Sequence, residues 1–157
     1  MKIYNGIEEL PQFKETVVSV GSFDGVHRGH RLLISRMNDL AESLGATSVI
    51  VTFDPHPREV LRGNNRLLST TPEKLILLKE AGAEHVLVIN FTQEFSQMPY
   101  DRFVKDILRG KLSATNIYVG EGHHFGKEKQ GGVDSFESLG IRTHLIERLE
   151  GISSTGV

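Results

Sequence analysis

Two histidines, His27 and His30, are the side chains of this sequence best suited to bind and polarise a charged group. They lie three residues apart, so on a helix they would face the same side. A β-branched run from Thr16 to Val20 precedes them and predicts a buried strand. The apolar residues that follow recur at helical spacing, at Leu33, Met37, Leu40 and Leu44. The histidines therefore stand where a strand ends and a helix opens near Gly29.

The junction between this strand and this helix is rich in glycine, at Gly21, Gly25 and Gly29. A helix start presents free backbone N–H groups, and the helix dipole adds positive potential there. Gly29, between the histidines, leaves room for a ligand to approach the backbone closely. The junction thus predicts an anion site, typically for phosphate. The alternative is a glycine-rich turn whose two surface histidines cap the helix.

The string from Gly21 to His30 reads GSFDGVHRGH. Its last four residues form the His-x-Gly-His signature of the HIGH-type nucleotidyltransferase superfamily. The whole string resembles the N-terminal adenylyltransferase module of bacterial FAD synthetases. The resemblance implies that His27 and His30 are catalytic, hydrogen-bonding the triphosphate of ATP. It also implies an ATP-binding loop made of Gly21, Ser22, Phe23, Asp24, Gly25 and Gly29.

Asp24 has two interpretations within this loop. It would orient a histidine or assist Mg²⁺, or else it would form an Asx-turn or a helix cap. Mg²⁺ is expected with ATP, held mostly by phosphates and water rather than by a protein cage. The adjacent His123 and His124 point opposite ways in an extended chain and lack further ligands, so we assign no metal-ligating residues.

A second motif, Asp54-Pro-His-Pro-Arg58, follows the strand expected at residues 48–53. Pro55 and Pro57 fix the backbone around His56, so a stiff loop would present the imidazole. The FAD synthetases carry Phe-x-Pro-His-Pro at this place, near the flavin phosphate. The resemblance thus implies that residues 55–57 bind flavin. A surface histidine on a proline-stiffened turn is the alternative.

Residues 119–127, VGEGHHFGK, are similar to the family motif Val-Gly-x-(Asp/Asn)-Phe-x-Phe-Gly. Three residues match and are implied to bind ATP, namely Gly120, Phe125 and Gly126. Gly122 departs from the motif, because the family usually has Asp or Asn there. A polar side chain expected to help position the ligand or metal is therefore missing.

The segment Ile152-Ser-Ser-Thr155 resembles the start of the family motif Ile-Ser-Ser-Thr-x-Ile-Arg. The hydroxyls of Ser153, Ser154 and Thr155 suit hydrogen bonds to phosphate or adenine, and the resemblance implies ATP binding. The sequence stops at Val157, before the Ile-Arg pair. We expect either a stand-alone or shortened form without a riboflavin kinase domain, or part of a larger product. That kinase domain would be covalently joined or separate.

The composition predicts one domain over residues 1–157, long enough to build a core. A net charge of −2 without a basic block gives no footprint for nucleic acid. The absence of cysteine excludes disulfides and thiolate chemistry. No apolar run has the length of a membrane span and no signal peptide is evident, so we expect a cytoplasmic protein that does not insert into membranes.

Strands and helices alternate along the chain with short links, which predicts an α/β fold. Further strands are expected at residues 85–90, 116–119 and 143–146, and helices after Thr71 and from Pro99 to Gly110, with a loop between Phe91 and Met98. Residues 1–14 are expected to cover a sheet edge. The expected architecture is Rossmann-like, an open and mainly parallel sheet with helices on both faces. Ligands in such sheets bind beyond the carboxyl ends of the strands, where each motif lies.

The resemblance implies an FMN adenylyltransferase that transfers AMP from ATP to FMN and releases FAD and pyrophosphate. Such chemistry depends on positioning and electrostatic stabilisation rather than on a covalent nucleophile. Two alternatives stay open. The first is a related His-x-Gly-His transferase with another phosphorylated acceptor. The second is a flavin- or nucleotide-binding protein with impaired catalysis.

Overall fold

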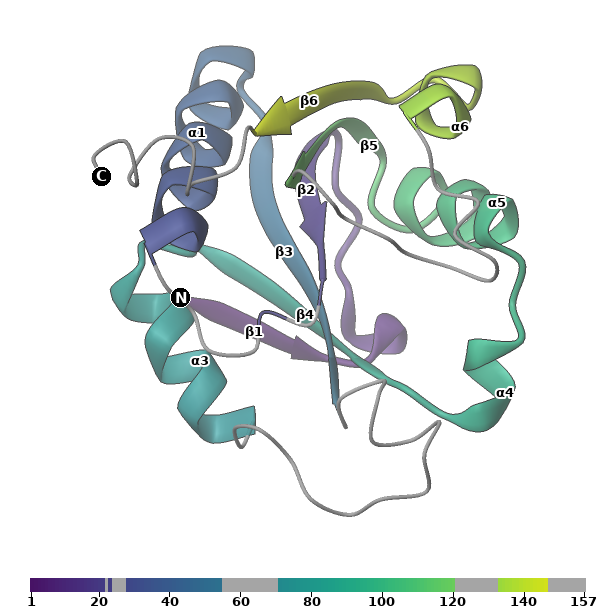
Figure 1. Cartoon of the computed structure of the whole chain (residues 1–157), viewed down its shortest axis with the longest axis horizontal. Helices are drawn as coiled ribbons and strands as arrows, with labels where there is room; N and C mark the ends of the chain where they lie inside the picture. Colours follow the sequence, from purple (N-terminus) through teal and green to yellow (C-terminus); the bar gives the residue numbers. More distant parts are fainter. Residues whose placement is uncertain (22, 24–27, 55–70, 121–132, 147–157) are drawn as a thin grey trace.

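The computed structural model describes residues 1–21, 23, 28–54, 71–120 and 133–146. They form one six-stranded sheet in the order β1-β4-β3-β2-β5-β6 (Figure 1). Each of the five strand pairings is parallel. The strands are β1 (Lys2–Asn5), β2 (Thr16–Val20), β3 (Thr47–Asp54), β4 (His85–Asn90), β5 (Ala114–Gly120) and β6 (Arg142–Ile146). The expected parallel α/β sheet is confirmed.

Helices cover both faces of the sheet (Figure 1). One face carries α1 (Arg28–Leu44) and α3 (Thr71–Glu80). The other carries α5 (Tyr100–Phe103), the π-helix η2 (Val104–Arg109) and α6 (Val133–Ser138). The short helix α4 (Gln93–Ser96) and the 3-10 helix η1 (Ile7–Glu9) complete the described helices. Helices on both faces were expected, and this too is confirmed.

The middle strands are buried on both faces, which is why their sequences are nearly continuous apolar runs. Every residue of β2 is buried, as are the six inner residues of β3. Strands covered on both sides cannot alternate apolar and polar residues as a half-exposed strand does. The polar exceptions are satisfied internally, since the Ser19 hydroxyl donates to the Tyr118 carbonyl over 2.9 Å.

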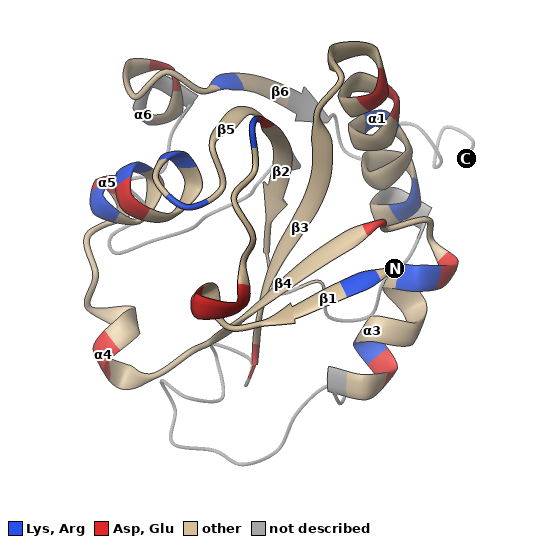
Figure 2. Ribbon diagram, turned by 180° about the vertical axis from the view of Figure 1, so that it is seen from behind, with Lys and Arg blue, Asp and Glu red and all other residues tan. Residues whose placement is uncertain are grey.

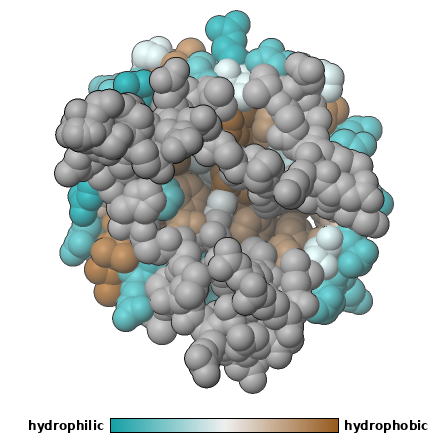
Figure 3. Space-filling view, viewed as in Figure 1, coloured by the Kyte–Doolittle hydropathy of each residue, from teal (hydrophilic) through white to brown (hydrophobic). Residues whose placement is uncertain are grey.

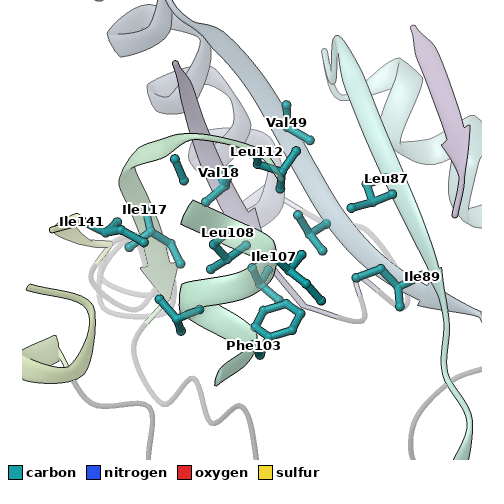
Figure 4. Packing of buried hydrophobic residues seen from close by; sticks show 14 of the residues in the cluster. Val18, Val49, Leu87, Ile89, Phe103, Ile107, Leu108, Leu112, Ile117 and Ile141 are labelled. Carbon is teal, nitrogen blue, oxygen red and sulfur yellow. The ribbon is translucent and has the colours of Figure 1, made fainter. Parts of the chain in front are cut away.

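Two apolar clusters, one on each side of the sheet, hold the layers together. Figure 4 shows the larger cluster, in which Leu108 lies near Val18 and Ile117 of the sheet and Phe103 lies beside Ile107. The smaller cluster joins α1 and α3 to the opposite face and contains Phe23, Ile34, Met37, Ile50 and Leu78. Burial of this kind contributes about 25 cal/mol per Å² of apolar area removed from water.

One local expectation is wrong. The stretch from Phe91 to Met98 is not all loop, because α4 forms within it and the Thr92 hydroxyl accepts a hydrogen bond from the Phe95 amide at 2.9 Å. The helix expected from Pro99 to Gly110 is confirmed, and its hydrogen bonding changes to the π type at Val104. The apolar stripe itself is as expected, since both turns bury their large side chains.

The lead-in segment forms part of the sheet. Lys2 to Asn5 pair in parallel with His85 to Val88 and make β1 the edge strand beside β4. The Tyr4 hydroxyl lies 3.2 Å from the His85 ring nitrogen Nδ1, and the two rings are stacked. The expectation that this segment covers a sheet edge is therefore confirmed, with a strand as the covering element.

Charged residues of both signs are interspersed on the outer helices α3 and α5 (Figure 2). Figure 3 shows hydrophilic residues around the rim of the face seen in Figure 1 and apolar residues nearer its centre. Within the described ranges, no helix combines the length and apolar character needed to cross a bilayer.

Candidate active site

The carboxyl ends of β3, β2 and β5 lie side by side. The register pairs Val20 of β2 with Val51 of β3, and Val18 of β2 with Ile117 of β5. The chain leaves β2 in one direction, through α1 to β3, and later returns on the other side of β2 as β5. This reversal is the topological switch point at which open α/β sheets bind their ligands. The three predicted motifs therefore follow three neighbouring strands.

The loop after β2 contains a strained aromatic residue, Phe23. The Gly21 amide continues the ladder by donating to the Val51 carbonyl at 3.0 Å. Phe23 then adopts a φ of 50°, in the left-handed region that side chains with a Cβ seldom occupy, at a cost of roughly 1–2 kcal/mol. Its ring is buried, with 6% exposed, and lies over Gly21. Strain held in place by packing is a frequent feature of ligand sites.

His30 stands in the first turn of α1, as expected, and its ring is partly buried. The Phe23 and His30 ring centroids are 5.0 Å apart, with the planes inclined at 53°. Because α1 follows the end of β2, its amino end and His30 belong to the carboxyl edge of the sheet. The structure thus brings together Gly21, Phe23 and His30, three of the residues predicted from the sequence. It places Gly29 one residue earlier in the same helical turn.

Asp54 ends β3, and its carbonyl accepts a hydrogen bond from the Phe91 amide at 3.1 Å. The preceding residues are held from another direction by Lys74 of α3. The Lys74 ammonium donates to the Thr52 hydroxyl oxygen at 3.3 Å and to the Phe53 carbonyl at 3.1 Å. Only 3% of Lys74 is exposed. The sequence did not predict this buried cation at the carboxyl end of β3.

A signal for Lys74 is present in the sequence. The first turn of α3 contains Glu73, which suits the positive end of the dipole, and Lys74 follows it directly. A lysine in the first turn of a helix opposes the dipole. Such a departure from local preference points to a tertiary role.

Gly120 ends β5 and pairs with Ile146 of β6, so it lies at the same edge as Gly21. Just inside this edge, the Tyr118 and His144 rings stack with centroids 4.6 Å apart. The His144 Nε2 lies 2.8 Å from the Asn116 side-chain oxygen. Burial raises the pKa of the Tyr118 hydroxyl, and burial followed by the charge of Arg142 lowers the pKa of His144. Both shifts favour the neutral forms.

The other predicted site residues lie outside the described residues: Ser22, Asp24, Gly25, His27, Pro55, His56, Pro57, Phe125, Gly126, Ser153, Ser154 and Thr155. Their assignments stay predictions. Gly122, His123 and His124 also lie outside. Among the residues that are described, no group of three or more metal-ligating side chains gathers.

The geometry defines a class of protein: a doubly wound parallel α/β domain with a helix start and a histidine at its topological switch point. The comparison with family models gives the particular family. The model described as FAD synthetase matches residues 10–153, and this chain belongs to that family.

Curated relatives agree with this family. The chain is 32% identical to the bifunctional riboflavin kinase/FMN adenylyltransferase of Pseudomonas fluorescens and 31% identical to that of Escherichia coli K12, in each case over 90% of this chain and 46% of the relative. A putative enzyme of the same name from Geobacillus thermodenitrificans is 33% identical, over 85% of this chain and 72% of the relative. The chain thus spans about half the length of most of these relatives.

Solved structures agree on the fold. A Streptococcus pneumoniae protein named as a macrolide-efflux protein superposes with a TM-score of 0.79 at 20% identity, covering 94% of this chain and 50% of the other. The pantoate-beta-alanine ligase of Francisella tularensis, in complex with beta-gamma ATP and beta-alanine, gives a TM-score of 0.55 at 15% identity, covering 94% of this chain and 67% of the other. At these identities the likeness concerns the fold.

Proposed function

We propose that this chain is an FMN adenylyltransferase, which transfers AMP from ATP to FMN and releases FAD and pyrophosphate. The observation that carries the proposal is the position of His30, in the first turn of α1 at the switch point, in a chain of the FAD synthetase family. A helix amino end supplies N–H groups and positive potential for phosphates. The imidazole adds a hydrogen-bond donor beside them.

In the proposed reaction, an oxygen of the FMN phosphate attacks the α-phosphorus of ATP in line. A new O–P bond forms as the bond to the oxygen bridging the α- and β-phosphorus breaks, and pyrophosphate leaves with that electron pair. His30 and His27 would donate hydrogen bonds to the oxygens on which charge increases. The loop after β2, with Gly21, Ser22, Phe23, Asp24 and Gly25, would hold the triphosphate, and residues 55–57 the flavin side.

Three further assignments belong to this proposal. Mg²⁺ would enter with ATP and neutralise charge on the phosphates, held mainly by their oxygens and by water, its usual arrangement at nucleotide sites. A riboflavin kinase domain, joined or separate, would supply FMN, as the names of the bifunctional relatives suggest. The protein would act in the cytoplasm as a single nucleotidyltransferase domain over residues 1–157.

A binding protein with impaired catalysis is the second candidate. Gly122 favours it, because the family motif usually has a polar Asp or Asn at that place. Such a protein would bind FMN or ATP and release no pyrophosphate. A transferase with another phosphorylated acceptor would release pyrophosphate only when that acceptor is supplied in place of FMN.

One experiment separates the FMN adenylyltransferase from the binding protein. Purified protein is incubated with ATP, Mg²⁺ and FMN, flavins are separated by chromatography, and pyrophosphate is assayed in parallel, with binding of FMN and ATP measured by calorimetry. The proposal predicts FAD and pyrophosphate in equal amounts, and neither when FMN or Mg²⁺ is left out. Binding without either product would support the impaired protein and contradict the proposal.

A further inference from the structure

Lys74 fills a gap in the hydrogen bonding at the end of β3. The Val51 carbonyl faces β2, because it accepts the Gly21 amide. Carbonyls alternate in direction along a strand, so the Phe53 carbonyl faces the same side, beyond the last residue of β2. The Lys74 ammonium donates to that carbonyl at 3.1 Å. A side chain from α3 thus takes the place that a backbone amide would have if β2 continued.

The same ammonium also fixes the face of β3 that lies under α3. The Thr52 hydroxyl oxygen accepts from Lys74 at 3.3 Å, and Thr52 is fully buried. On the opposite edge, the ladder pairs Thr52 with Val88 and Phe53 with Ile89. The strand end is therefore held by β4 on one side and by Lys74 on the other, directly before the chain continues into residues 55–57.

Helix stability alone does not favour lysine at this position. A cation in the first turn of α3 opposes the helix dipole, and removing an ammonium from water is costly unless it gains hydrogen bonds. Lys79, in the last turn of the same helix, is exposed and suits the dipole. Lys79 therefore stands where helix stability favours a lysine, whereas the burial and hydrogen bonds of Lys74 indicate a role in tertiary structure.

We propose that Lys74 is a positioning residue for the flavin side of the site. By holding the Phe53 carbonyl and the Thr52 hydroxyl, it fixes the end of β3, the strand that directly precedes residues 55–57 in the sequence. The inference rests on the proposed function, because residues 55–57 are its flavin-binding segment. It assigns no contact between Lys74 and a substrate.

The test compares Lys74→Met, which keeps the length of the side chain and removes its charge, with Lys79→Met as the matched control. We expect Lys74→Met to raise the KM for FMN about tenfold, as loss of hydrogen bonds from a charged donor can, and to change the KM for ATP less than about twofold. Hydrogen exchange should speed up in the peptide that contains Phe53 and Asp54 and stay unchanged in β2. Lys79→Met should behave as the wild type.

The chain has no cysteine, so a rescue experiment can address this position alone. Lys74→Cys is alkylated in denaturant with 2-bromoethylamine, which rebuilds an ammonium of nearly the same length, or with 1-iodopropane, which gives an apolar side chain of similar length that cannot donate a hydrogen bond. After refolding, the first product should recover the KM for FMN and the second should not. Equal recovery by both would mean that only packing matters, and would overturn the inference.

Binding of FMN and of ATP, measured on the same proteins, separates this inference from the proposed function. If the wild type binds FMN but forms no FAD, the proposed function fails, whereas weaker FMN binding by Lys74→Met with unchanged ATP binding still supports Lys74 as a positioning residue. Equal weakening for both ligands, no weakening, or a wild type that does not bind FMN would overturn the inference.

Discussion

The Phe23 and His30 rings lie against each other at the start of α1, with centroids 5.0 Å apart and planes inclined at 53°. Phe23 reaches this position only by adopting a φ of 50°, and its ring is buried. The contact couples the backbone of the loop after β2 to the imidazole proposed to stabilise the triphosphate. An apolar neighbour on one side restricts the orientations that the imidazole can adopt.

Replacing Phe23 should affect turnover more than folding. Phe23→Leu keeps an apolar side chain but removes the flat ring surface beside His30, so we expect kcat to fall about tenfold, because a small displacement of a catalytic group is costly. The free energy of unfolding in urea should fall by about 1 kcal/mol, because leucine is smaller than phenylalanine but still fills most of the buried space. Phe13→Leu, on the opposite face of the sheet, is the control. Unchanged kcat in Phe23→Leu would contradict a role for this contact.

The anchoring of α1 should matter for stability. Ile34 of α1 is fully buried between the helix and the sheet, whereas Ile76 of α3 is 58% exposed. Ile34→Ala should lower the free energy of unfolding by about 2–5 kcal/mol, and Ile76→Ala by about 0.5 kcal/mol or less. Urea titration followed by circular dichroism measures both. Similar losses in the two variants would mean that α1 is not held as described.

His144 should make the protein less stable in mild acid. Its pKa is lowered from 6.5 by burial and by Arg142, with Glu137 opposing. As the pH falls below about 6.5, the unfolded chain takes up a proton that the folded protein resists, so the unfolded state gains stability. His144→Gln removes this titration and retains an amide that can bond Asn116. The decline in unfolding free energy between about pH 7.5 and 5.5 should therefore be shallower in the variant than in the wild type, and parallel curves would contradict the assignment.

Much of the fold was predictable because buried parallel strands have a distinctive sequence. The apolar run Thr16–Val20 matches β2 at both ends, and the predicted strand at residues 48–53 lies within Thr47–Asp54. Apolar spacing also found the buried side of the helix after Pro99. It could not distinguish hydrogen bonds of the α type from the π type, because both bury a similar stripe over two turns. The short helix α4 depends on one capping residue, Thr92, and left no periodic pattern to detect.

The candidate site, like the fold, was predictable only in part. Sequence motifs located His30, Gly21 and Phe23, which the structure brings to one edge of the sheet. Lys74 was missed because its partners, Thr52 and the Phe53 carbonyl, are more than twenty residues away, and only the fold brings them within reach. The strain at Phe23 was also unpredictable, because φ depends on the packing of the ring rather than on a local signal.

The most direct measurement compares the rate of FAD formation from FMN, ATP and Mg²⁺ in the wild type, His30→Ala, His27→Ala and the control His144→Gln. The account predicts that wild type and control form FAD, and that each site variant keeps its circular dichroism spectrum while losing about 10²–10³-fold in rate, as expected for removal of a donor to the transition state. His30→Ala protein that forms FAD at the wild-type rate would contradict the central claim.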